Sequence, residues 1–394
     1  MKLIRFTLAL LFVVFGLSSV QAAKAETLKD ALIGAYRHSG LLDQQRALLR
    51  AADEDVAQSL AALRPIVSAQ VDAGYGRSAF PGDEWDYSAS LGLSASLTLY
   101  DGGSSKLGID AAKESVLSAR ESLVSVEQQI LLRAANAFFE VRRQTEFVGL
   151  RRNNVRLIGQ ELQAAEDRFE VGEVTRTDVA LAEARLAGAR SSLAASQGAL
   201  IRAEEEYFNA VGRRPGALSR LPALPKVPSS KEGAVRLAER QHPDIIAAQR
   251  NVKISEINVA RAEASLKGTL SLRGSATFDQ DFNSSDNIGL RYSVPLYQGG
   301  QLSSLVRQAS QNVDASKASL HIVVHNIRQG VGNAYAGIAV ARATKAATDE
   351  QVRAADTAFR GVREEATLGA RTTLDVLDAE QELLDARTEQ ISAV

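Results

Sequence analysis

The sequence contains the same pattern twice. Residues 99–103 (LYDGG) recur as residues 296–300 (LYQGG), 197 positions later, and residues 171–183 share several identities with residues 368–380 at the same offset. Upstream of these segments the offset is 203, so the first copy has six additional residues. Chance does not preserve one offset over so many identities. The chain is therefore a structural duplication, and each half is expected to form the same series of elements.

Each LYxGG segment is followed by a very long helix. Residues 104–170 and 301–367, 67 residues each, contain no proline. An α-helix of that length measures about 100 Å, which exceeds the helices of ordinary globular domains. Each stretch ends at a glycine turn, Gly172 or Gly369, and a second helix is predicted after the turn. Each half therefore contains a long helical hairpin.

The second helix of each hairpin has a coiled-coil repeat. Apolar residues recur every seven positions, and small residues on the neighbouring seam allow a close approach of helices. In the first copy the two seams are Val179, Leu186, Leu193, Leu200 and Tyr207, with Ala182, Ala189 and Ser196; the second copy has Val376 and Leu383, with Ala379, Ala386 and Ala393.

Before each long helix, the sequence predicts one helix and two strands. The helices are expected over residues 28–63 and 231–266. Apolar residues then alternate with serine, glycine and threonine over residues 67–76, 87–99, 270–278 and 288–296, which is the pattern of strands. Their length fits the 9–11 residues that cross a bilayer when tilted. Transmembrane strands with a polar luminal face are predicted, and a soluble sheet is the alternative.

The N-terminus predicts export from the cytoplasm. Lys2 and Arg5 precede an apolar run at residues 8–20, which is too short to span a bilayer, and small residues precede possible cleavage sites after Ala22 and Ala25. A signal peptide at residues 1–25 is expected, with a retained anchor as the alternative. After the signal peptide, the chain is predicted to consist of a first repeat at 26–212, a proline-rich connector at 213–230 and a second repeat at 231–394. The last helix is about four turns shorter than its counterpart, which suggests C-terminal truncation.

Composition excludes several functional classes. The chain has no cysteine and only 4 histidines, so disulfides, thiol catalysis and cysteine-ligated metals are absent. The balance of 46 basic and 47 acidic residues gives no electrostatic reason to expect nucleic acid as a partner. His321 and His325 have the spacing of zinc ligands, but Ile322 stands where a zinc protease has its glutamate. We expect no enzyme activity, catalytic residue, cofactor or metal site.

Three segments together resemble the TolC-type outer-membrane channel family. They are residues 97–103 (LTLYDGG), 168–179 (RFEVGEVTRTDV) and 369–379 (GARTTLDVLDA). The resemblance implies a mainly α protein with β-structure: a long α-helical coiled-coil barrel joined to a transmembrane β-barrel, built by an obligate homotrimer with four strands per chain. Physical chemistry agrees, because four strands cannot close a barrel and an open sheet edge in lipid leaves backbone groups unpaired.

The resemblance also implies functional residues at the hairpin tips. It places a periplasmic gate at four charged residues, of which the aspartates near the second tip form carboxylate rings in a trimer; the alternative is that these are solvated charges that suit a helix start. The gate residues are Asp178, Arg371, Asp375 and Asp378, with Arg371 expected to reach Asp178 across neighbouring hairpins. The tip residues implied to contact an adaptor are Val171, Gly172, Thr175, Leu368, Gly369 and Thr372.

The resulting functional hypothesis is a passive exit duct in the outer membrane, with its helical tunnel in the periplasm. Its implied partners are outer-membrane lipid, a periplasmic adaptor (membrane fusion) protein, and an inner-membrane pump or ABC exporter. The cargo is small toxic compounds in tripartite efflux, or unfolded proteins in type I secretion. Residues 80–86 and 279–287 are expected to connect the strands outside the cell. The alternative is a soluble periplasmic coiled-coil adaptor or scaffold, which leaves the four strands unexplained.

Overall fold

The computed structural model describes residues 25–77, 85–219 and 225–393. The chain divides into two compact units, each with segments from both copies of the duplication. The hairpin unit contains Met1–Ser39, Gln129–Lys226 and Gly337–Val394, and the sheet unit contains Gly40–Gln128 and Val227–Ala336. The predicted signal peptide, apart from Ala25, lies outside the described residues, as do residues 220–224 of the connector and most of the 80–86 connection.

The two long helices are confirmed with the predicted bounds. They are α4 (Ser104–Glu170) and α8 (Gln301–Thr367), of 67 residues each. Gly102 and Gly103 precede α4 with φ of 69° and 92°, and the Asp101 carboxylate accepts the backbone N–H groups of Gly103 and Ser105 at 3.0 and 2.7 Å. The LYDGG segment therefore ends a strand and starts a helix within a few residues.

The predicted single helices before the strands are wrong, because each is two helices. In the first copy α2 (Leu28–His38) and α3 (Gly40–Ala61) are separated at Ser39, whose backbone is extended. In the second copy α6 (Lys231–Gln241) and α7 (Pro243–Ala264) are separated at His242, and a short 3₁₀ turn, η1 (Ser265–Lys267), follows. A residue that precedes proline avoids the helical conformation, which accounts for the second break.

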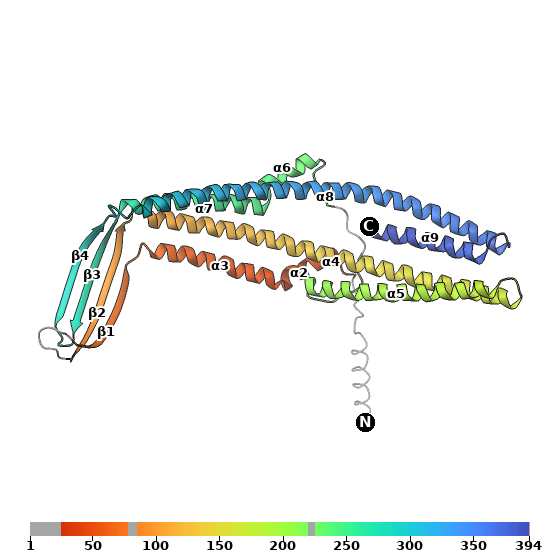
Figure 1. Cartoon of the computed structure of the whole chain (residues 1–394), viewed down its shortest axis with the longest axis horizontal. Coiled ribbons are helices and arrows are strands. Elements are labelled where there is room, and N and C mark those ends of the chain that lie inside the picture. Colours follow the sequence, from red (N-terminus) through yellow and green to blue (C-terminus); the bar gives the residue numbers. More distant parts are fainter. Residues whose placement is uncertain (1–24, 78–84, 220–224, 394) are drawn as a thin grey trace, which may run out of the picture. The chain divides into compact units, whose positions relative to one another are not determined.

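The sheet unit contains a four-stranded antiparallel sheet in the order β1-β2-β3-β4 (Figure 1). Its strands are β1 (Ile66–Arg77), β2 (Trp85–Tyr100), β3 (Thr269–Asp279) and β4 (Ser284–Ser293). The prediction for the last strand was wrong at both ends: it begins four residues earlier than expected and stops before Pro295, which cannot donate to a ladder. The connection predicted at 279–287 is correspondingly shorter.

The strand register places the apolar residues of all four strands on one face. Residues directly opposite each other share a face of an antiparallel sheet, and Leu91 lies opposite both Val71 of β1 and Phe278 of β3. The other face carries small polar residues, as at Ser94, which lies opposite Ser68 and Ser275. The predicted alternation is therefore confirmed. Both faces are largely exposed in the single chain.

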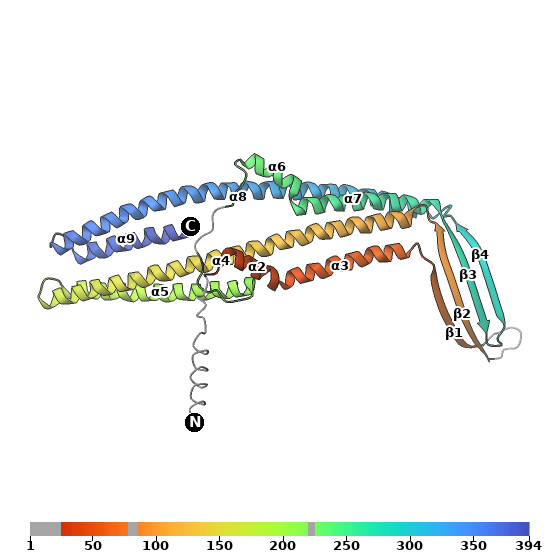
Figure 2. The same ribbon diagram turned by 180° about the vertical axis from the view of Figure 1, so that it is seen from behind.

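In the hairpin unit, α5 (Arg176–Val211) lies along α4, and α9 (Thr373–Ser392) lies along α8 (Figure 1; Figure 2). The seam residues predicted from the heptads are largely buried: Ala182, Leu186, Ala189 and Tyr207 in α5, and Val376, Leu383 and Ala386 in α9. Helix α2 packs on the first hairpin, in a core formed with Phe138, Val141 and Tyr207. Both hairpins are therefore closed by apolar seams, as coiled coils are.

Candidate functional site: the hairpin tips and the contact between hairpins

The two hairpin tips have the same backbone structure. Gly172 has φ of 80° and donates to Phe169 O at 3.0 Å, and the next N–H, of Glu173, reaches back to Arg168 O. Gly369 has φ of 78° and donates to Ala366 O at 3.1 Å, with the N–H of Ala370 on Glu365 O. These are Schellman motifs, which need a left-handed residue and therefore favour glycine. The recurrence of Gly172 and Gly369 has a structural reason.

A capping box follows each tip. The Asp178 carboxylate accepts the Thr175 N–H at 2.8 Å, and the Thr175 hydroxyl accepts the Asp178 N–H. Thr372 and Asp375 repeat this arrangement at the start of α9, with the corresponding bond at 2.9 Å. Hydrogen bonds from Thr175 lower the pKa of Asp178, and hydrogen bonds from Thr372 lower the pKa of Asp375, so both are ionised at neutral pH. Asp178 and Asp375, two of the predicted gate residues, therefore also stabilise the N-termini of α5 and α9.

The tips present apolar side chains to solvent. Val171 is 71% exposed and Leu368 is 85% exposed, and both stand immediately before the glycine of their turn. Each is a single exposed apolar side chain at the end of a hairpin, where a partner can reach it. The role of these residues as adaptor contacts stays a prediction.

Arg371 and Asp178 do not meet within one chain. The Arg371 guanidinium donates to Glu365 Oε2 at 2.8 Å, in the same turn, and this contact raises the pKa of Arg371. Asp178 is engaged by Thr175. The predicted Arg371–Asp178 pair therefore requires a neighbouring copy, and sequence reasoning missed Glu365, which is the partner of Arg371 inside the chain.

Asp378 links the two hairpins. Its carboxylate accepts from Arg185 Nη2 of α5 at 2.9 Å, so the ion pair joins α5 of the first hairpin to α9 of the second. Both side chains are partly exposed, and such a pair contributes about 0–1 kcal/mol. Sequence reasoning missed Arg185, because nothing local marks a contact between residues so far apart in the chain.

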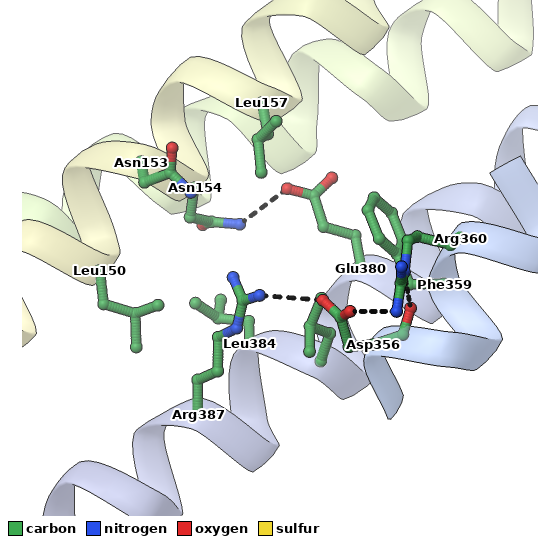
Figure 3. Close-up of a pocket in the computed structure, with 11 residues that line it drawn as sticks. Leu150, Asn153, Asn154, Leu157, Asp356, Phe359, Arg360, Glu380, Leu384 and Arg387 are labelled. Atoms are coloured by element: carbon green, nitrogen blue, oxygen red, sulfur yellow. Dashed lines mark hydrogen bonds and ion pairs between the residues drawn. The ribbon is translucent and has the colours of Figure 1, made fainter. Parts of the chain in front are cut away.

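A second contact between the hairpins is buried. Glu380 of α9 is 4% exposed, Asn154 of α4 is 5% exposed, and Asn154 Nδ2 donates to Glu380 Oε1 at 3.3 Å (Figure 3). The pair borders a cavity of about 210 Å³. Sequence reasoning missed it, although a signal existed: Leu377 and Leu384 form a stripe at helical spacing, and Glu380 lies on that stripe.

Within the described residues, no group of histidine, aspartate or glutamate side chains has an arrangement that holds a metal ion. The rings of His321 and His325 lie 4.2 Å apart between their centres and are exposed on α8. Among the helices of the described part of the chain, none combines the length and apolar character that crossing a membrane requires.

Comparison with known proteins gives concordant results. The family model "Outer membrane efflux protein" matches residues 35–213 and 234–393. The outer membrane efflux protein BepC of Brucella suis is 32% identical over 95% of this chain and 83% of its own length. The outer membrane protein TolC of Vibrio cholerae is 29% identical, over 95% and 89%. The crystal structure of the outer membrane protein VceC of Vibrio cholerae superposes with a TM-score of 0.78 at 20% identity, covering 93% of this chain and 92% of that one.

Proposed function

Because this chain belongs to the outer membrane efflux protein family, and so forms an exit duct in the outer membrane, we propose that three copies assemble into that duct. In this trimer each chain contributes its four strands to one β-barrel and its two helical hairpins to one periplasmic tunnel. The duct is passive and catalyses no reaction. The observation that carries this proposal is the four-stranded sheet, in which β1 and β4 each pair with only one strand among the described residues.

The edges of the sheet support the oligomer. β1 and β4 are the outer strands of the order, so the backbone groups along one side of each have no partner strand within the sheet. In the hydrocarbon region each unpaired group costs several kcal/mol. Pairing β4 of one copy with β1 of the next removes every edge, and it turns the apolar face toward lipid and the small polar face toward the lumen.

The hairpin tips support the proposed partners. A duct with no energy source needs a pump, and the exposed Val171 and Leu368, beside rigid glycine turns, offer a docking surface for a periplasmic adaptor protein. The pump is an inner-membrane transporter or an ABC exporter. The Brucella suis relative is named an efflux protein, which favours small toxic compounds as cargo; unfolded proteins are the second candidate. Export to this location is proposed to depend on a signal peptide at residues 1–25.

Fractionation and cross-linking test the assembly. The protein is expected in the outer-membrane fraction as a species of three chains after cross-linking of intact cells. A soluble periplasmic monomer or dimer would instead support the adaptor or scaffold alternative and refute the trimeric duct.

The periplasmic gate gives a conductance prediction. Arg371→Ser is expected to raise the resting conductance of the purified trimer in a planar bilayer severalfold, because the substitution removes the same positive charge from the mouth in each of the three chains. Glu365→Gln is the matched comparison: it is expected to reproduce the effect if the pair inside the turn positions Arg371, and to leave conductance unchanged if only Asp178 of a neighbour matters.

The proposed aspartate rings are tested by substitutions that remove their charge and keep the helix cap. Asp375→Asn together with Asp378→Asn removes both charges per chain, while the carboxamide oxygen of the first substitution still accepts the Thr372 N–H that Asp375 accepts in the capping box. Cation selectivity is expected to weaken. If Arg371→Ser leaves conductance unaltered and the double variant keeps its selectivity, the four charged residues have no gating role.

A further inference from the structure

The buried contact between the two hairpins has an unusual electrostatic state. Glu380 reaches from α9 toward Asn154 of α4 and receives one hydrogen bond, at 3.3 Å (Figure 3). Its other oxygen, Oε2, is buried and has no hydrogen-bond partner among the described residues. An ionised carboxylate in this position lacks most of the hydrogen bonds that water would supply. The arrangement therefore suits the protonated acid, whose O–H can pair with the Asn154 carboxamide oxygen after a rotation of that amide.

The surrounding charges do not neutralise Glu380. The two arginines that line the adjoining cavity are already engaged, since Arg387 and Arg360 both donate to Asp356, at 3.0 and 2.9 Å. Leu157 and Phe359 provide apolar surface. On the same helix α9, Asp378 is held by Arg185 of α5. No cation is therefore bonded to Glu380 by the elements packed around it in the described part of the chain.

Two further charged residues shift the pKa of Glu380 in opposite directions. Burial is the largest cause of the raised pKa of Glu380, which is about 7 instead of its ordinary 4.5. The nearby carboxylate of Glu161, on α4, raises the pKa further, whereas the hydrogen bond from Asn154 and the charge of Arg363, on α8, lower it. α4 and α8 thus each contribute a charged or polar neighbour to Glu380 of α9, so the protonation of Glu380 depends on the packing of the second hairpin against the first.

We propose that the Asn154–Glu380 contact is a proton-sensitive latch between the hairpins, which is closed when Glu380 is protonated and released when Glu380 is ionised. The effect on export rests on the proposed function: the hairpins form the periplasmic end of the proposed tunnel, so their separation widens its mouth. The packed state binds the proton more tightly than a state in which water reaches Glu380. Falling pH therefore favours packing, and packing weakens as pH rises from 4.5 to about 7.

The latch is tested by measuring the distance between the two hairpins of one chain within the trimer. The chain has no cysteine, so spin labels at Arg152→Cys on α4 and Glu382→Cys on α9, both exposed positions, report the separation by electron–electron double resonance. Trimers in which a labelled chain is diluted with unlabelled chains restrict the signal to one chain. The packed fraction is expected to fall about 10- to 100-fold relative to the released fraction between pH 4.5 and pH 7.

Three variants distinguish a latch from a structural role. Glu380→Gln keeps the shape and cannot ionise, so it is expected to stay packed at every pH. Glu161→Gln removes the like charge and is expected to move the midpoint to lower pH, whereas Arg363→Gln is expected to move it to higher pH. Glu183→Gln is the control, because Glu183 occupies the equivalent position of the first copy and is exposed; it is expected to leave the pH profile unchanged.

The outcomes separate the latch from the gate. A pH-dependent separation that persists in Glu380→Gln, or midpoints that do not move in opposite directions in the Glu161 and Arg363 variants, overturns the latch. If Glu380→Gln does not assemble, the midpoint shifts of those two variants still decide. Conductance of the same trimers is measured in parallel. A separation that follows the predicted pH profile with unchanged conductance upholds the latch and refutes the effect of hairpin separation on the periplasmic mouth.

Discussion

Leu93→Arg is expected to prevent assembly of the outer-membrane trimer. Leu93 lies near the middle of β2, opposite Ala69 of β1 and Ala276 of β3, on the apolar face of the sheet. In the proposed barrel this face meets lipid, where an arginine at midplane depth costs about 2–4 kcal/mol, and the cost recurs in each of three chains. The amount of heat-resistant trimer in the outer-membrane fraction measures the effect.

The neighbouring residue provides the control. Ser94 lies opposite Ser68 and Ser275 on the small polar face, so Ser94→Arg places the same charge one residue away and toward the proposed lumen. This variant is expected to assemble and to have an altered single-channel conductance. Equal tolerance of both substitutions would contradict the assignment of the two faces.

Gly369→Pro is expected to abolish export while trimers remain in the membrane, and Gly172→Pro is expected to do the same. Proline requires φ near −65°, whereas Gly369 has φ of 78° and its N–H donates to Ala366 O. The substitution therefore removes the turn at the tip, where an adaptor is proposed to dock, and leaves the sheet unit unaltered. Cargo export is measured alongside the amount of membrane-inserted trimer.

Alanine at the same positions separates the effect of an added side chain from the effect of losing the turn. A side chain at Gly172 or Gly369 meets no atom within 4 Å, so alanine costs only the left-handed conformation, about 1–2 kcal/mol. It keeps the N–H that closes the Schellman motif. Export is expected to decrease only modestly in the alanine variants.

Normal export in both proline variants would instead exclude the hairpin tips from the export mechanism.

The sequence predicted the long elements correctly because their signals are local and repeated. Both 67-residue helices have the predicted bounds, since the absence of proline and the flanking glycines act within a few residues of each end. The apolar and polar faces of the strands were predictable for the same reason: alternation is a property of the chain itself. The duplication added a second, independent reading of each pattern.

The errors lie where one or two residues decide the conformation. A single extended residue, Ser39 or His242, divides each predicted N-terminal helix into two. The last strand was shifted because apolar residues beyond Ser293 continue the alternation past the end of the ladder. Hydrophobic periodicity averages over a window and therefore does not locate such breaks.

The sequence by itself determined the duplication, the long hairpins, the alternating strands and the glycine turns, because each follows from periodicity and from backbone preferences of neighbouring residues. Only the tertiary structure decided which polar and charged side chains meet: Arg371 with Glu365, Arg185 with Asp378, and Glu380 with Asn154. The last two pairs join residues 193 and 226 positions apart. Such partners are set by how the hairpins pack, and the burial that makes Glu380 sensitive to protons exists only after that packing.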